Sequence, residues 1–376
     1  MNILITGGAG FIGTSLALAL IDKGHVITVL DNLSEQIHGA AAEKNSFLYQ
    51  KIKNKVVFIK GDVCNEDDWK KVLQGQDVVV HLAAETGTGQ SMYLIKKYTD
   101  VNIGGTSLML DLLANGHYRV KKVVIASSRA IYGEGRYVAA DGTYVYPSSR
   151  NKERLSAGKF EVEYKGNEKL QLTSTDEESK IHPTSVYGIT KQVQEQMVMT
   201  VCPSIGISPV AFRYQNVYGP GQSLKNPYTG ILSIFSNLIK HGQPINIFED
   251  GKESRDFVFI DDVVAATVAG IEMDAANGEV FNVGTGIATT VMEVAETLIE
   301  GYGKKVPLNI SGDFRIGDIR HNYADITKLN TKLGFTPSVS FRDGIRKFTS
   351  WVNQQEVELI DYNKSLSEMK SKGLMK

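Results

Sequence analysis

The chain has 376 residues, with 41 Lys and Arg against 42 Asp and Glu, and a formal net charge of -1. This length is enough for two domains with a cleft, and it can bury a sizeable core without disulfides or metals. The near-neutral charge gives no extended field that would gather nucleic acid or an anionic membrane, which excludes both as principal partners.

Two cysteines, Cys64 and Cys202, are present. Two are too few for a disulfide framework or a cysteine-based zinc site, so we expect no metal, structural roles for both thiols and a reducing compartment. The apolar run at residues 2–5 leads directly into glycines, without a charged leader or an apolar stretch of about 18 residues. We therefore expect a cytoplasmic protein.

Short runs of β-branched residues alternate with helix-length segments through the first half of the chain. This alternation predicts βαβ units and an α/β fold, a Rossmann-type doubly wound parallel sheet. The centres of the fourth and fifth runs are apolar at every position, as expected where helices cover both faces. The predicted strands are residues 2–6, 25–30, 56–60, 78–82, 122–126 and 209–213.

The first predicted strand runs into the sequence GGAGFIG at residues 7–13, followed by a helical run over residues 14–23. Glycines there permit a tight turn and close approach of the backbone to a pyrophosphate, whose charge the helix N-terminus stabilises. Asp31 ends the next strand, where its carboxylate can bind ribose hydroxyls and repel a 2′-phosphate. Because Asn32 rather than an arginine follows, NAD is favoured over NADP. Asp62, after the third strand, can bind the adenine amino group.

Tyr187 and Lys191 stand at positions i and i+4 of a predicted helix, which places both on one face. The pKa of tyrosine is about 10 in water, so the phenol needs a neighbouring cation to act as a base at neutral pH. Lys191 can supply that charge. Ser128, at the end of the fifth strand, adds a hydroxyl that can bind the reacting oxygen and pass a proton.

The second half of the chain has shorter elements, broken by glycine and proline. We expect residues 1–214 to form the dinucleotide domain and residues 215–360 mainly a smaller C-terminal substrate domain, with 257–285 returning to the first. Residues 135–180 are polar and weakly periodic, and they are interpreted as an insertion. For the Lys- and Ser-rich tail, residues 361–376, we expect fraying or disorder.

The motifs TGGAGFIG, HLAAE, SSRAIYG, YGITK, RYQNVYGPGQ, RDFVFIDD, FNVGTG and GDIRH resemble the extended short-chain dehydrogenase/reductase family, specifically its nucleotide-sugar epimerases and dehydratases, over roughly residues 1–350. The resemblance implies Tyr187 as base, Lys191 on the nicotinamide ribose, Ser128 as hydroxyl partner, and a tightly held NAD that is returned unchanged. It also implies a homodimer paired through helices near residues 94–113 and 187–200. The residues it places around NAD are Gly7, Gly10, Phe11, Ile12, Gly13, Asp31, Asn32, Asp62, Val63, Leu82, Ala83, Ala84, Asn102, Tyr187, Lys191 and Tyr214.

The same resemblance implies a nucleotide-diphosphate sugar as the second ligand. Arg255 and Arg320 match positions that hold the pyrophosphate, because guanidinium groups bind its oxygens in pairs. Ile247 and Phe248 match an apolar pair near the base. The residues expected around the substrate are Thr86, Gly87, Gln90, Ser128, Arg129, Asn216, Asn226, Ile247, Phe248, Arg255 and Arg320.

Arg129 and Ala130 stand where the family's dehydratases carry Asp and Glu, so elimination loses its acid–base groups. Epimerisation at C4 needs only Tyr187, NAD and a pocket in which a 4-keto sugar can turn. Two roles stay open for Arg129: shaping the pocket or pairing with the insertion. The alternatives are a UDP-hexose 4-epimerase, a 4-ketoreductase and a non-catalytic NAD-binding protein.

Three features resemble the dTDP-L-rhamnose 4-epimerases within this family, which interconvert dTDP-L-rhamnose and dTDP-6-deoxy-L-talose: residues 32–39, the insertion, and residues 222–230. A dTDP-6-deoxyhexose is therefore the expected substrate. Some relatives carry cysteine pairs in the insertion and this chain has none. We expect the insertion to hold itself by packing alone, and to cover the sugar pocket or to form part of a dimer surface.

Overall fold

The computed structural model describes residues 1–376 apart from 166–168, 225, 227–229, 358, 360–361 and 376. Its largest element is a parallel seven-stranded sheet of order β14-β9-β5-β4-β1-β2-β3. The predicted Rossmann-type α/β fold is confirmed. The strands are β1 (Asn2–Thr6), β2 (Val26–Asp31), β3 (Val57–Lys60), β4 (Val78–His81), β5 (Lys122–Ser128), β9 (Ser208–Tyr214) and β14 (Glu279–Val283).

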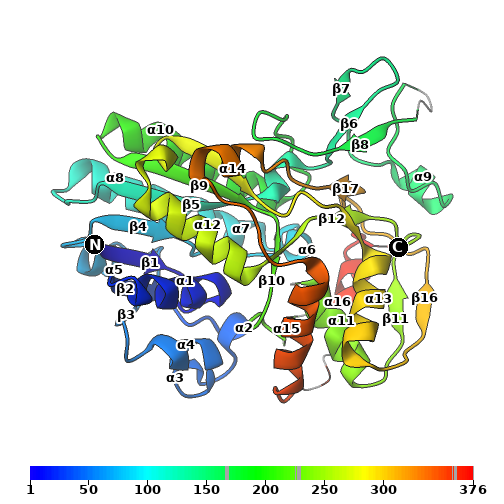
Figure 1. Ribbon diagram of the computed structural model, residues 1–376, viewed down its shortest axis with the longest axis horizontal. Coiled ribbons are helices and arrows are strands. Elements are labelled where there is room, and N and C mark those ends of the chain that lie inside the picture. Colours follow the sequence, from blue (N-terminus) through cyan, green and yellow to red (C-terminus); the bar gives the residue numbers. More distant parts are fainter. Residues whose placement is uncertain (166–168, 225, 227–229, 358, 360–361, 376) are drawn as a thin grey trace.

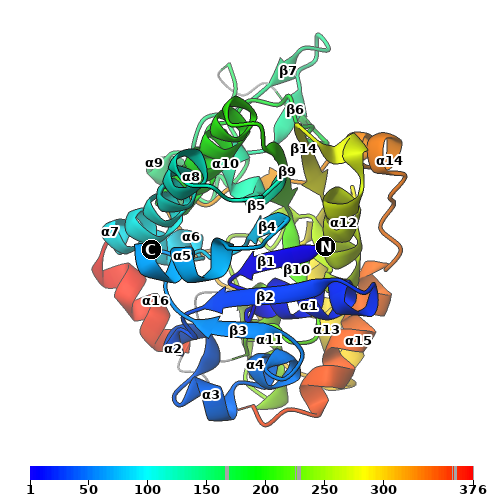
Figure 2. The same cartoon turned by 90° about the vertical axis from the view of Figure 1, so that its left-hand side faces the viewer.

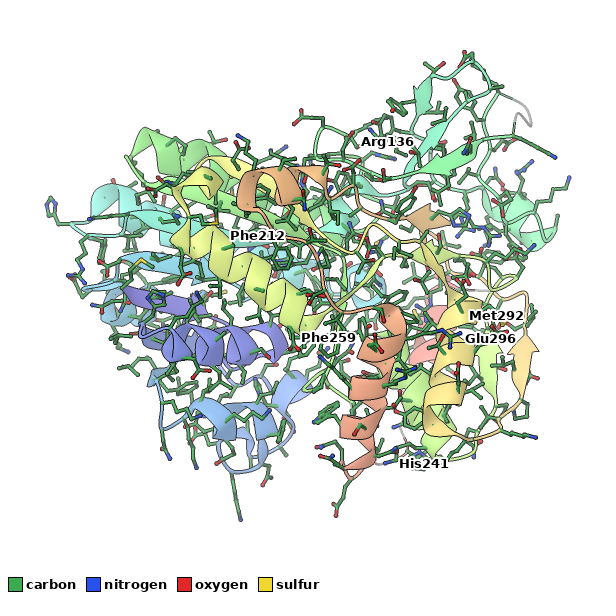
Figure 3. The ribbon with its side chains drawn as sticks, in the orientation of Figure 1. Arg136, Phe212, His241, Phe259, Met292 and Glu296 are labelled. Atoms are coloured by element: carbon green, nitrogen blue, oxygen red, sulfur yellow. The ribbon has the colours of Figure 1, made fainter. Side chains whose placement is uncertain are left out.

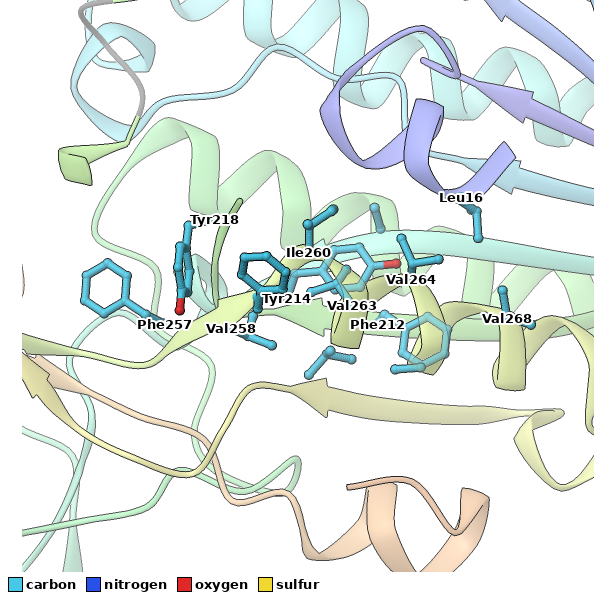
Figure 4. Packing of buried hydrophobic residues seen from close by; sticks show 14 of the residues in the cluster. Leu16, Phe212, Tyr214, Tyr218, Phe257, Val258, Ile260, Val263, Val264 and Val268 are labelled. Atoms are coloured by element: carbon cyan, nitrogen blue, oxygen red, sulfur yellow. The ribbon is translucent and has the colours of Figure 1, made fainter. Parts of the chain in front are cut away.

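Side chains of the sheet alternate between two apolar clusters, one on each face. Ile3 and Ile5 of β1 point into one cluster and Leu4 into the other. Phe212 of β9 and Val264 lie together in the first (Figure 4). Because both faces are apolar, helices cover both: α1 (Phe11–Asp22), α12 (Ile260–Glu272) and α14 (Thr327–Leu333) on one, and α5 (Glu66–Leu73), α8 (Gly105–Asn115) and α10 (Val186–Ser204) on the other.

The strand order reverses between β1 and β4. In open α/β sheets such a point leaves a crevice at the carboxyl ends of the strands, where ligands bind. Short helical segments follow the strand ends on both sides of this point: α2 (Glu35–His38), α3 (Ala42–Asn45), α4 (Phe47–Ile52), α6 (Thr88–Ser91), α7 (Ile95–Tyr98), the π-helical η1 (Thr99–Gly104) and the 3-10 helix η2 (Arg129–Tyr132).

The second half of the chain adds small sheets and further helices, and its helix α12 packs on the large sheet, which β14 joins as an edge strand (Figure 1). No helix in the described ranges is long and apolar enough to cross a bilayer. The remaining elements are β10 (Asn216–Tyr218), α11 (Ile231–Lys240), β11 (Ile245–Ile247), β12 (Ser254–Arg255), β13 (Phe257–Phe259), η3 (Asp274–Ala276), β15 (Thr289–Thr290), α13 (Val291–Tyr302), β16 (Leu308–Ile310), β17 (His321–Asn322) and α15 (Phe341–Asn353).

The insertion forms a three-stranded antiparallel sheet, β6 (Arg136–Val138), β7 (Tyr144–Val145) and β8 (Gln171–Thr173), with the short helix α9 (Lys152–Ser156). It projects from the body of the molecule, and Figure 3 labels Arg136 within it. The expectation that packing alone holds it is wrong. Arg150 donates from both terminal nitrogens to Glu249, at 2.6 and 2.7 Å, and both side chains are buried. Charge pairing across 99 sequence positions therefore fixes the insertion to the second half of the chain.

In the described part of the tail, residues 362–375, the chain is largely helical rather than frayed or disordered. The helix α16 (Tyr362–Ser371) follows α15, and the side chains of Met369 and Met375 are buried. The backbone N–H of Ile316 donates to the carbonyl of Leu374 at 3.0 Å. The polar composition concealed these two methionines, whose burial anchors the segment.

Candidate active site

A cavity of about 1300 Å³ lies where the carboxyl ends of the large sheet face β12, α11 and the loop containing Arg315 and Asp318. Sites for a single small ligand measure roughly 300–1,000 Å³. This cavity therefore has room for a dinucleotide and a second ligand placed end to end.

The glycine loop forms one end of this cavity. Gly10 begins α1 without a side-chain cap, and Gly10, Phe11 and Ile12 line the cavity, so the helix N-terminus faces the space that a pyrophosphate would occupy. A Cβ on Gly13 would lie 2.4 Å from the carbonyl oxygen of Gly7, so this close packing requires glycine. Gly7 has a φ of +66°, which also favours glycine.

The Asp31 carboxylate is held at the cavity wall by two backbone N–H groups, those of Ala9 at 3.0 Å and Leu33 at 2.8 Å. Burial raises its pKa above the ordinary value, although the Leu33 hydrogen bond opposes that rise. Each oxygen has a second lone pair for a ribose hydroxyl. His38, which the sequence analysis did not single out, also lines the cavity, with Nε2 3.8 Å from Asp31 Oδ1. These residues fit the adenosine half of a dinucleotide.

Two of the residues predicted to contact the cofactor do not line the cavity. Asp62 accepts a hydrogen bond from the Cys64 N–H at 2.8 Å and stands beside the lining residue Val63. Asn102 is fully buried, and its amide bonds Thr190 and the backbone of Glu85, which positions the loop after β4. The lining residues among those predicted are Gly7, Gly10, Phe11, Ile12, Gly13, Asp31, Asn32, Val63, Leu82, Ala83, Ala84, Tyr187, Lys191 and Tyr214.

Ser128, Tyr187 and Lys191 meet on one wall of the cavity. Strand β5 extends to Ser128, and α10 carries the other two residues on one face of its first turns. Helix α10 is in close contact with η2, which directly follows β5, because a Cβ on Gly188 would lie 2.5 Å from the carbonyl oxygen of Ala130. This contact explains how residues 59 positions apart, from 128 to 187, share one site.

The electrostatics of this wall suit proton transfer. Burial raises the pKa of the Tyr187 phenol, while its hydrogen bond to Ser128 and the charge of Arg129 oppose the rise. Burial lowers the pKa of Lys191 to about 7, and its ammonium group donates to the Ala126 carbonyl at 2.9 Å. A nearby cation stabilises a phenolate, and among the charged groups around Tyr187 it is Arg129 that favours ionisation of its phenol.

Arg129 lines the cavity, and its Nε donates to the Asn216 side-chain oxygen at 2.7 Å. Burial and the neighbouring Arg255 lower the pKa of Arg129 to about 10. Of the two roles left open for this residue, the contact with Asn216 corresponds to shaping the pocket.

Tyr98 supports the loop after β4, because its hydroxyl donates to the Thr86 carbonyl at 2.6 Å.

Two arginines, Arg255 and Arg315, line one end of the cavity, which is called the cationic end. They differ from the predicted pair, Arg255 and Arg320. Arg255 lines the cavity and pairs with Asp318 at 2.9 Å, but Arg320 is fully buried and bound to Glu161 and Asp250. Arg320 therefore does not face a pyrophosphate. Arg315, which the sequence analysis missed, lines the cavity with its guanidinium 5.1 Å from the Phe248 ring centroid. Arg315 and Arg320 share one loop, and sequence alone does not give the direction of either side chain.

Of the two apolar residues predicted to lie near the nucleotide base, only one lines the cavity. Phe248 lines the cavity, whereas Ile247 is fully buried in the core, because neighbouring residues of an extended segment point to opposite sides. Residues 225 and 227–229 of the predicted 222–230 stretch lie outside the described residues. The lining residues among those predicted for the substrate are Thr86, Gly87, Gln90, Ser128, Arg129, Asn216, Asn226, Phe248 and Arg255.

Glu253 is a further cavity residue that the sequence analysis missed. Its side chain is buried, Oε2 has no hydrogen-bond partner among the described residues, and Arg320 lies 4.0 Å away. Burial, reinforced by the charge of Glu249, raises its pKa to about 7. Because this folded-state pKa exceeds the ordinary glutamate value of 4.5, the protein loses stability as pH rises from 4.5 through 7.

We expect Glu253→Gln to raise the free energy of unfolding at pH 8 by about 3 kcal/mol at most, and hardly at pH 4.5. Urea unfolding of the ligand-free protein across this pH range measures the difference. Glu296→Gln, at an exposed site on α13 that Figure 3 labels, is the control. Parallel stability curves for parent and Glu253→Gln would contradict the prediction.

Comparisons with known proteins agree with this geometry. The family described as "NAD dependent epimerase/dehydratase family" matches residues 3–284. The chain is 37% identical over 356 residues to a dTDP-L-rhamnose 4-epimerase of Burkholderia thailandensis, covering 94% of this chain and 95% of that protein.

Two solved structures are similar over nearly their whole length. The UDP-glucose 4-epimerase of Thermotoga maritima with UDP-glucose is 31% identical, with a TM-score of 0.74 over 94% of this chain and 99% of that one. The UDP-glucuronic acid 4-epimerase of Bacillus cereus with UDP-glucuronic acid and NAD is 27% identical, with a TM-score of 0.75 and the same coverage. The chain belongs to the NAD dependent epimerase/dehydratase family and is an NAD-dependent nucleotide-sugar epimerase.

Proposed function

We propose that the protein interconverts dTDP-L-rhamnose and dTDP-6-deoxy-L-talose by epimerisation at C4. The observation that carries this proposal is that Ser128, Tyr187 and Lys191 line one cavity together with the glycine loop and with Arg255 and Arg315. The similarity to a dTDP-L-rhamnose 4-epimerase supports the choice of sugar. The proposal includes tightly bound NAD and a homodimer paired through α8 and α10.

The site residues divide the work of the reaction. Tyr187 removes the proton of the C4 hydroxyl, and Ser128 holds that oxygen by a hydrogen bond. The glycine loop and Asp31 would hold NAD, which would supply reversible hydride transfer at C4. Lys191 and Arg129 stabilise the tyrosinate by their charge. Tyr187 would then return the proton to the oxygen at C4, so the protein would end in its starting state.

The anionic part of the substrate fits the cationic end of the cavity. Arg255 and Arg315 would hold the pyrophosphate, and Phe248 would pack against the base. With the pyrophosphate fixed, the small residues Gly87 and Gly89 after β4 leave space in which the sugar can turn. Arg129 and Ala130 next to Ser128 provide no carboxyl group for elimination, which favours epimerisation over dehydration.

The test is incubation of the purified protein with dTDP-L-rhamnose, UDP-glucose and UDP-glucuronic acid, without added NADH. We expect a second isomer only from dTDP-L-rhamnose, separable by chromatography. Conversion of a UDP-hexose alone would favour the alternative UDP-hexose 4-epimerase, which UDP-sugar-binding neighbours make the second candidate. Turnover that requires stoichiometric NADH would indicate a 4-ketoreductase.

A further inference from the structure

The C-terminal helix forms part of the substrate cavity. Met369 of α16 is 6% exposed, and its side chain lines the cavity. Its sulfur lies 3.3 Å from the position that a Cβ on Gly89 would take. Gly89 belongs to α6, in the loop after β4 expected to face the sugar, and Figure 2 shows α16 beside this part of the molecule. Met369 therefore adds a thioether to the sugar side of the cavity.

The same segment is fixed to the loop that carries Arg315. Arg315 pairs with Met375 in an isolated β-bridge, and Lys370 Nζ lies 3.4 Å from Asp313 Oδ2. On the other side, the Lys372 ammonium stands 4.8 Å from the Tyr93 ring centroid, close to α6. The C-terminal segment thus contacts both the loop that carries Arg315 and the region of α6 after β4. These two attachments give Met369 a defined position.

The chemistry of Met369 selects among sugars. A thioether is a weak acceptor without a donor, and its methyl and methylene groups pack against apolar atoms. Gly89 beside it has no side chain, so this part of the wall, unlike the neighbouring Thr88 and Gln90, offers no side-chain hydrogen-bond donor. A hydroxyl buried against this wall loses its hydrogen bonds to water, whereas a methyl group gains apolar contact. The exocyclic carbon of a 6-deoxyhexose is such a methyl group, while that of a hexose carries a hydroxyl.

We propose that Met369 forms the wall against the C6 methyl group of a 6-deoxyhexose and makes the enzyme prefer it over the C6-hydroxylated hexose. The proposal rests on the proposed function, since it assumes that C4 reacts at Tyr187 while the pyrophosphate lies at Arg255 and Arg315. Gly89 and Met369 line the same cavity as these groups, and the proposal places the C6 methyl group against them.

The experiment compares kcat/KM of the full-length protein for dTDP-L-rhamnose and for dTDP-L-mannose, which differs only by a hydroxyl at C6. We expect the parent to prefer the 6-deoxy sugar by roughly 10- to 100-fold, the range that an apolar pocket achieves against an added hydroxyl. Met369→Gln, which introduces an amide donor and acceptor at similar length, should reduce this ratio about tenfold. Met369→Leu and Ser371→Ala, the latter an exposed position on the same helix, should preserve it.

A parent without preference at C6, or a Met369→Gln variant that slows both substrates equally, would overturn the proposal. Equal loss would mean that Met369 only supports the fold, and urea unfolding of the variant would then show reduced stability. If the parent converts a different nucleotide sugar, the proposed function fails. The comparison is then made between the 6-deoxy and 6-hydroxy forms of that sugar, and the same ratios decide the role of Met369.

Discussion

Arg320→Met is expected to destabilise the protein by about 3 kcal/mol. Arg320 is fully buried, and it binds Glu161 Oε1 at 2.5 Å and Asp250 Oδ1 at 2.7 Å. Removing one partner of a buried ion pair costs roughly 3–5 kcal/mol, because the other charge loses its compensation. We expect the lower end, since Glu161 and Asp250 are partly exposed and water can solvate them once Arg320 is gone. The midpoint of urea unfolding measures the loss.

Arg315→Met is the matched control, because Arg315 lies in the same loop but lines the cavity. It should leave the unfolding midpoint near that of the parent and reduce kcat/KM for the nucleotide sugar about tenfold or more, as expected when a charged contact to a phosphate is removed. Should Arg320→Met instead keep full stability and raise KM as Arg315→Met does, Arg320 would be the pyrophosphate ligand after all.

The fold followed from local patterns in the sequence because each predicted strand carried its own signal. Strand β1 matches the predicted residues 2–6, since a buried apolar run ends abruptly at glycine. Strand β5 continues beyond the predicted residue 126 to Ser128. Serines weaken the apolar pattern, although backbone pairing with β9 extends through them. The predicted strand was therefore two residues too short, and the missing residues include Ser128 of the candidate site.

The site was less predictable wherever a side chain depends on partners distant in sequence. The direction of Arg320 is set by Glu161 of the insertion and Asp250, and that of Arg150 by Glu249. Periodicity and composition do not record such pairs. The tail departs from the expected disorder for a related reason. Met369 and Met375 are buried by contacts with loops that are distant in sequence.

Tyr187→Phe is expected to lower kcat by roughly 10²–10⁴-fold, the usual contribution of a positioned acid–base group. The hydroxyl group is the only group removed, so the glycine loop and the Asp31 carboxylate, which the Ala9 and Leu33 N–H groups hold, should still bind the dinucleotide. KM and the unfolding midpoint should stay close to those of the parent. Isomer formation from dTDP-L-rhamnose, with bound dinucleotide measured after denaturation, separates loss of chemistry from loss of cofactor.

The pH dependence of the parent supplies the second half of this test. A base must be deprotonated to act, and burial raises the pKa of Tyr187 while Ser128 and Arg129 oppose the rise. We therefore expect kcat/KM of the parent to fall as pH decreases, and Arg129→Met to move this fall to higher pH because a stabilising charge is lost. The Tyr187→Phe variant should lack the dependence. If that variant retained both the parental activity and the same pH profile, another group would accept the proton and Tyr187 would not be the base.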